Sequence, residues 1–103
     1  MQTLKLALKV DPADNVATIF ASDITDGTVV EVRDSAGKGQ QLTVIGDIPY
    51  GHKIALEDIP QGASIRKYGH VIGAASRPIR AGEYVHVHNL EALRGRGDWS
   101  KEG

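Results

Sequence analysis

A short pattern, Ile-x-x-Gly, occurs four times in this chain and limits its fold more than any other feature. In each copy we expect the isoleucine to lie in the core and the glycine to adopt the positive φ of a type II or related turn. Two copies carry proline directly after the isoleucine, and proline favours turns because its ring fixes φ. The irregular spacing excludes a solenoid and predicts a compact fold of short strands joined by similar turns. The four copies are residues 24–27, 48–51, 59–62 and 79–82.

Strand-like runs follow every copy of the pattern and fill much of the remaining chain. Alternation of apolar and polar residues is typical of a strand with one buried face. In the first run, Leu4, Leu6 and Leu8 alternate with Lys5 and Ala7, so we expect the leucines to face the core. The predicted strands lie within residues 3–10, 15–21, 28–32, 40–46, 52–56, 63–67 and 83–87.

The remaining segments complete the predicted fold class. Residues 67–75 hold two glycines in a β-rich setting, which indicates one bent or bulged strand. Residues 55–58 and residues 90–94 each predict a single helical turn. Residues 94–103 are polar and rich in glycine, so we expect a flexible tail after a domain that spans residues 1–93. The predicted fold is therefore mainly β, with short strands, tight turns and one or two short helical turns.

Composition excludes several classes of function. The chain has 103 residues and no cysteine, which rules out disulfide frameworks, thiolate metal sites and cysteine nucleophiles. A formal net charge of −1 argues against nucleic-acid binding by phosphate neutralisation. No run approaches the roughly 18 apolar residues of a membrane span, and the start lacks the pattern of a secretory signal. We therefore expect a cytoplasmic protein that binds neither nucleic acid nor membrane.

Two of the four histidines, His86 and His88, alternate with Val85 and Val87. On a strand, both imidazoles would share the face opposite the valines, followed by the amide of Asn89. One interpretation is a metal site or proton-handling site, which would need a third ligand or a partner subunit. The other is a pair of polar residues on a solvated strand face. Periodicity alone leaves both interpretations open.

The carboxylates show no spacing that is diagnostic of acid–base catalysis. Asp23, Asp47 and Asp58 each precede an isoleucine of the repeated turn pattern. We expect these side chains to accept hydrogen bonds from turn backbone. A nucleophile elbow and a phosphate-binding loop are absent from the sequence.

Residues 47–91 resemble the small domain of the altronate and galactarate dehydratase family, which has a SAF-type, β-clip fold. Several short motifs occur in order and at matching spacing, so the resemblance is specific. They are Ile48-Pro49-x-Gly51-His52-Lys53, then Ile59-x-x-Gly62, then Lys67-Tyr68-Gly69, and finally Ile79-x-x-Gly82-x-x-Val85-His86-x-His88-Asn89. The first half of the chain matches only in general shape.

The resemblance implies an activity, a cofactor and a partner. Members of this family remove water from a small sugar-acid substrate with the help of a divalent metal, iron(II) or manganese(II). A Lewis acid and a base together overcome the weak acidity of the α-proton and the poor leaving ability of hydroxide. The metal is expected to be bound mainly by a larger catalytic domain or subunit. This chain would be the small subunit or N-terminal domain and would be inactive alone.

The resemblance also implies site residues. We expect His86 and His88 to be catalytic and directed at the metal, and His52, Lys53, Tyr68 and Asn89 to bind substrate. Lys53 suits that role because a carboxylate substrate needs a cation. Three alternatives stay open: a small subunit of a sulfolactate sulfo-lyase, a non-catalytic SAF module that binds carbohydrate or protein, and an independent metal-binding protein.

Overall fold

A computed structural model describes residues 5–92, and within that range it contains nine strands and no helix. The predicted fold class, mainly β with short strands and tight turns, is confirmed. No helix in this range is long and apolar enough to cross a membrane. The strands are β1 (Leu6–Leu8), β2 (Val16–Ile19), β3 (Val29–Arg33), β4 (Gly39–Thr43), β5 (Lys53–Ala55), β6 (Ser64–Lys67), β7 (His70–Ala75), β8 (Tyr84–Val85) and β9 (Leu90–Ala92).

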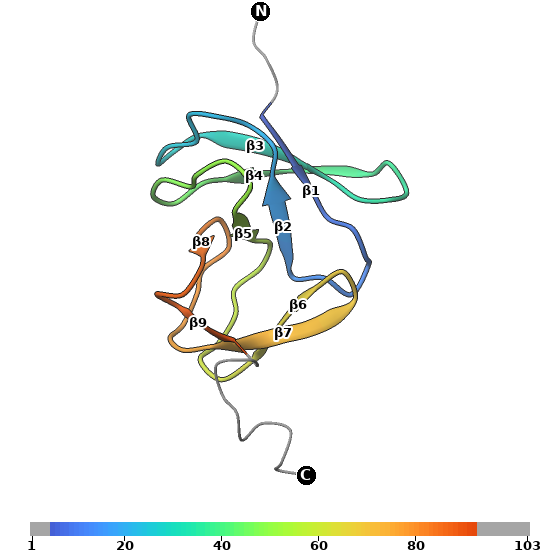
Figure 1. Cartoon of the computed structure of the whole chain (residues 1–103). Coiled ribbons are helices and arrows are strands. Elements are labelled where there is room, and N and C mark those ends of the chain that lie inside the picture. The colour runs from blue at the N-terminus through green and yellow to red at the C-terminus, as the bar shows by residue number, and fades with distance from the viewer. Residues whose placement is uncertain (1–4, 93–103) are drawn as a thin grey trace, which may run out of the picture.

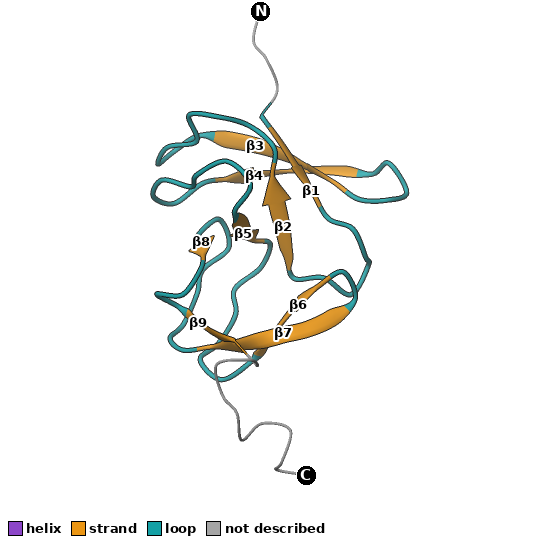
Figure 2. Cartoon of the chain, in the orientation of Figure 1, coloured by secondary structure: helices purple, strands orange, loops and turns teal. Residues whose placement is uncertain are grey.

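The strands form two sheets. The larger has the order β4-β3-β1-β2-β5-β8, and the smaller has the order β6-β7-β9. In Figure 1, β3 and β4 cross the top of the view, the smaller sheet lies at the bottom, and β2 and β5 run between them. Figure 2 shows how much of the chain between the short strands is turn and loop. Strands β5 and β8, far apart in sequence, are neighbours at one edge of the larger sheet.

Strand β2 separates two hydrophobic cores. Its alternate residues belong to different cores: Ala17 and Ile19 to the first, Val16 to the second. All four residues of β2 are therefore buried, whereas a strand with one wet face would alternate. The first core also contains Ile24 and Ile48, and the second contains Ile59 and Ile79. Each core thus includes the isoleucines of two of the four repeated turns.

The repeated turns have the predicted conformation. The glycines at positions 27, 51, 62 and 82 have φ of 89°, 83°, 88° and 96°. In the first turn, the N–H of Thr28 donates to the carbonyl of Thr25 at 3.0 Å, and equivalent bonds close the other three. This bond and a positive φ at the third position are the features of a type II turn. The four isoleucines are no more than 2% exposed.

The turns also associate in pairs. Ile24 forms an antiparallel bridge with Ile48, and Ile59 forms one with Ile79. Within each pair, an aspartate from one turn accepts a hydrogen bond from the backbone of the other. Asp47 accepts from the N–H of Asp26 at 3.3 Å, and Asp58 accepts from that of Ala81 at 3.0 Å. The predicted role of these two aspartates is confirmed, although each one stabilises the facing turn. Asp23 instead adopts a left-handed φ of 57°.

Two expectations about local structure are wrong. The core-facing residue of β1 is Ala7, while Leu8 is exposed, because Ala7 lies opposite the bulky Ile19 and Val32 of the neighbouring strands. Helical turns are also absent from residues 55–58 and from the described part of residues 90–94, where β9 is found. In residues 55–58, the N–H of Ala55 donates to the carbonyl of Glu83, and the N–H of Leu56 donates to the carbonyl of Asn15.

Residues 67–75 form a hairpin turn followed by strand β7, so the predicted bent or bulged strand begins only at His70. Tyr68 and Gly69 have φ of 57° and 78°, as a two-residue hairpin turn requires. The buried Asp14 carboxylate accepts hydrogen bonds from the N–H groups of Tyr68 and Gly69, at 2.9 and 2.8 Å. The predicted bulge is present in β7, because Ile65 pairs with Gly73 and Arg66 with Val71, which leaves Ile72 as the extra residue. The predicted flexible tail, residues 94–103, lies outside the described residues.

Candidate functional site

Strand β8 stops at Val85, and residues 86–89 form a turn. Val87 is 76% exposed, so the expected arrangement of inward valines and outward histidines on one strand is wrong. Asn89 is the cause. Its Oδ1 accepts from the N–H of His86 at 2.9 Å, and its Nδ2 donates to the carbonyl of Tyr84 at 2.8 Å. These bonds turn the chain before a longer strand can form.

The turn brings four aromatic rings together, which we call the histidine cluster: His52, Tyr84, His86 and His88. Tyr84 is its centre. Its ring stacks on His86 with centroids 5.5 Å apart and planes 8° apart, and lies 5.3 Å from the ring of His88. His52 packs edge-on against both Tyr84 and His86, at 5.4 and 5.0 Å. Three of the four histidines of the chain therefore share one site.

Tyr84 also bonds directly to a histidine: its hydroxyl lies 2.9 Å from Nδ1 of His52. Strand pairing produces this contact, because β5 and β8 run antiparallel with Lys53 opposite Val85 and Ile54 opposite Tyr84. Sequence analysis missed Tyr84. The available signal was its position two residues before His86, which would place both on one face of a strand.

The charge around the cluster is positive. Partial burial and the nearby positive groups of His52, Lys53 and His88 lower the pKa of His86 below its ordinary value. Burial, with a smaller contribution from Lys67, lowers the pKa of Lys53. His86 is therefore neutral near pH 7 and able to accept a proton or bind a cation, while Lys53 remains a cation beside it.

Comparison with protein families identifies this fold. Residues 5–93 match the SAF domain of altronate/galactarate dehydratases. The chain belongs to this family. The SAF-type fold expected from the resemblance is therefore confirmed, and it extends to the first half of the chain.

Relatives of this SAF domain are of two kinds. One kind is a long enzyme: altronate dehydratase of Escherichia coli is 44% identical over 80% of this chain, and galactarate dehydratase of the same organism is 41% identical over 76%. The chain spans only 15% and 14% of these two proteins. The other kind is short: subunit alpha of (2R)-sulfolactate sulfo-lyase from Chromohalobacter salexigens is 35% identical, and the match covers 90% of that subunit.

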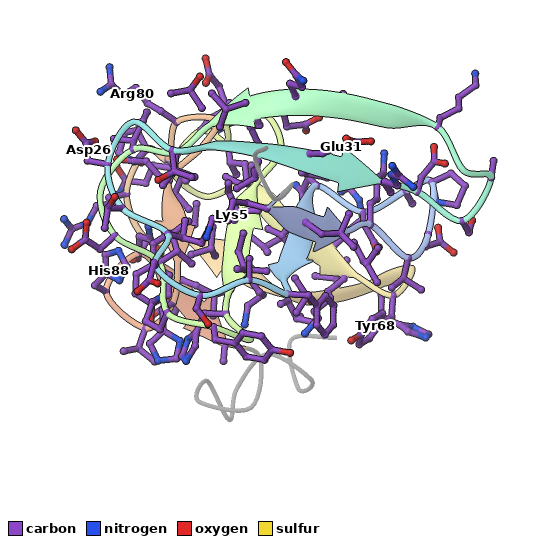
Figure 3. The ribbon with its side chains drawn as sticks, turned by 90° about the horizontal axis from the view of Figure 1, so that it is seen from above. Lys5, Asp26, Glu31, Tyr68, Arg80 and His88 are labelled. Carbon is purple, nitrogen blue, oxygen red and sulfur yellow. The ribbon has the colours of Figure 1, made fainter. Side chains whose placement is uncertain are left out.

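The SAF domain does not bring all the predicted site residues together. His52, His86 and His88 meet, with Lys53 adjacent in β5. Tyr68 lies at the tip of the β6–β7 hairpin, and Figure 3 places it at the opposite end of the view from His88. Asn89 is next to the cluster but only 3% exposed, and its amide is used by the backbone of the turn. Its observed task is to position His86, which differs from the predicted contact with substrate.

The described residues alone do not fit a resident metal ion. Between residues 5 and 92, no group of three or more His, Asp or Glu side chains is arranged to hold one. The rings of His86 and His88 both pack against Tyr84, and the cation Lys53 is near enough to lower the pKa of His86. Protein sites for zinc or iron require three or more ligands. These histidines could at most add ligands to an ion that another protein surface provides.

Proposed function

We propose that this SAF domain forms one side of the active site of a lyase that acts on sugar acids. The observation that carries the proposal is the gathering of His52, His86 and His88 around Tyr84 at an exposed turn and sheet edge, with Lys53 near enough to lower the pKa of His86. Such a surface has the chemistry of an active site but lacks an enclosing wall. In this proposal, the larger catalytic domain or subunit supplies the opposite wall, and the SAF domain is inactive alone.

The charge of this surface suits an acidic substrate. Lys53 makes no ion pair among the described residues, and the ion pair formed in that range joins Arg33 to Glu31. A partly buried ammonium group without a carboxylate partner has lost part of its hydration. Binding of an anionic ligand offsets this desolvation penalty. We therefore propose that Lys53 and His52 bind a carboxylate of the sugar acid.

His86 and His88 are proposed as the proton-handling groups. Elimination of water from a sugar acid needs a base for the α-proton and an acid for the departing hydroxyl. A neutral His86 can accept a proton, and His88 is close enough to Tyr84 to share the same surface. The divalent iron or manganese ion, bound mainly by the partner, would supply Lewis-acid stabilisation of the developing negative charge.

A second candidate substrate is sulfolactate. It is favoured by the near-complete coverage of a sulfo-lyase alpha subunit, which has the same size as this domain. The proposed roles of Lys53 and the histidines are the same for either substrate, because sulfolactate and sugar acids both carry a carboxylate. The substrate assay below distinguishes the two.

The experiment is co-expression of this chain with a large catalytic subunit of the same family, followed by assays with altronate, galactarate and sulfolactate. We expect turnover by the complex and by neither subunit alone. His86→Ala and His88→Ala should each lower kcat about 100-fold, the usual contribution of a general acid or base. His70→Ala is the matched control, because His70 is exposed on β7, outside the cluster, and should leave kcat unchanged.

Two results would contradict the proposal. Full turnover by an intact complex of either cluster variant would remove the histidines from the chemistry. Stable association with a partner but no turnover of any of the three acids would indicate a non-catalytic binding module.

A further inference from the structure

We infer that Tyr84 is a positioning residue that keeps the proton of His52 on Nε2 and directs this N–H outward as a hydrogen-bond donor. The inference rests on the proposed function for its ligand, an anionic oxygen of the substrate. Its physical basis is independent of that function. It assigns a role to a residue that neither the motifs nor the periodicity singled out.

The first step is the bond between the Tyr84 hydroxyl and Nδ1 of His52, at 2.9 Å. In a neutral imidazole, one ring nitrogen carries the proton and the other accepts, and the partner of one nitrogen decides the state of the other. A phenol that donates to Nδ1 therefore places the ring proton on Nε2.

The second step is the direction of that bond. Tyr84 is half-buried, and its hydroxyl has no other hydrogen-bond partner among residues 5–92. If Nδ1 of His52 were the donor, the phenol hydrogen would be left without a protein acceptor, which costs free energy in a partly buried site. Donation from Tyr84 to His52 satisfies both groups.

The third step is the free nitrogen. Nε2 of His52 has no hydrogen-bond partner within the described range, and the ring is half-buried. Its backbone is fixed on both sides, because its N–H donates to Pro49 and its carbonyl accepts from Ile19. A ring fixed at Nδ1 and at the backbone presents the Nε2–H in one direction, which lowers the entropic cost of binding an external oxygen.

The test uses the full 15N-labelled chain at pH 8, above the ordinary histidine pKa of about 6.5, and long-range 1H–15N correlation spectra of the four histidines. We expect His52 to show a protonated Nε2 and an unprotonated, hydrogen-bonded Nδ1. Tyr84→Phe removes the hydroxyl and retains the ring that stacks on His86, and it should move both His52 nitrogen shifts toward those of exposed His70. Tyr50→Phe, which removes a hydroxyl that has no histidine contact, is the matched control and should leave His52 unchanged.

The inference is overturned if wild-type His52 carries its proton on Nδ1, or if Tyr84→Phe leaves both nitrogen shifts where they were. These readouts need no turnover, so they decide the inference even if the proposed lyase activity fails. In an active complex, Tyr84→Phe should raise KM about fivefold, the size expected for one lost hydrogen bond, with a smaller effect on kcat. An unchanged KM would show that the Nε2–H does not meet the substrate.

Discussion

Residues of the family motifs occur in two regions of this domain, the histidine cluster and the tip of the β6–β7 hairpin. The two regions are stabilised by different contacts. In the histidine cluster, side chains contact one another, and Tyr84 connects His52, His86 and His88. At the hairpin tip, which comprises Lys67, Tyr68 and Gly69, the backbone is fixed by Asp14, while the Tyr68 side chain is 53% exposed and contacts Lys67, whose Nζ lies 4.7 Å from the ring centroid.

This difference indicates a division of tasks. The pKa values of His86 and Lys53 are both lowered, and perturbed pKa values are common at functional sites. A hairpin with a fixed backbone and an exposed aromatic side chain at its tip has the features of a structural or docking element. Matching a family motif therefore does not place a residue in the active site; the strand pairing decides which motif residues meet.

The largest expected effect on stability comes from replacing a turn glycine with alanine in each region. Gly82 precedes the histidine cluster, and Gly69 lies in the hairpin tip. Gly82→Ala should destabilise the domain by about 4 kcal/mol, because φ is 96° and the new methyl group would meet the backbone carbonyl of Thr43. Gly69→Ala should cost about 1 kcal/mol, since the added Cβ would meet the movable end of the Asp11 side chain. Urea unfolding measures both, and equal losses would contradict this difference between the two ends.

Two buried polar side chains provide a sharper comparison. Asp14→Ala should cost about 3 kcal/mol, because the carboxylate accepts three backbone hydrogen bonds. Asn89→Ala should cost about 2 kcal/mol and also displace His86. The NMR shifts of the cluster histidines should change in the second variant and stay unchanged in the first. Cluster shifts that respond equally to both substitutions would show that the two ends are coupled.

The smallest effect is a pH dependence from His86. Its pKa is lowered in the folded state, so the unfolded chain binds a proton more readily. As pH falls below about 6.5, the ordinary histidine value, stability should decrease, and the decrease should continue until the folded pKa is passed. His86→Gln should weaken this slope in urea unfolding between pH 7.5 and pH 5, whereas His70→Gln should not. A slope unaffected by His86→Gln would contradict the lowered pKa.

Local features of the fold were predictable from sequence, and long-range features were not. The turns at the four glycines follow from residues within four positions of one another, so the pattern identifies them directly. The buried face of β1 could not be read from its leucines, because the pairing with β2 and β3 places Ala7 beside the buried Ile19 and Val32. In the candidate site, the contact of Tyr84 with His52 spans 32 positions and depends on the pairing of β5 with β8. The turn at residues 86–89 depends on the Asn89 side chain, which simple alternation ignores.

The central claim, that the histidine cluster faces a larger catalytic partner, is most directly tested by histidine footprinting. Diethyl pyrocarbonate acylates neutral imidazole, and this chain has four histidines, three in the cluster and His70 on β7. We predict that all four react in the free chain, and that the complex with the large subunit protects His52, His86 and His88 while His70 still reacts. Protection of His70 with a cluster that remains reactive would contradict the claim and would identify the hairpin end as the docking surface.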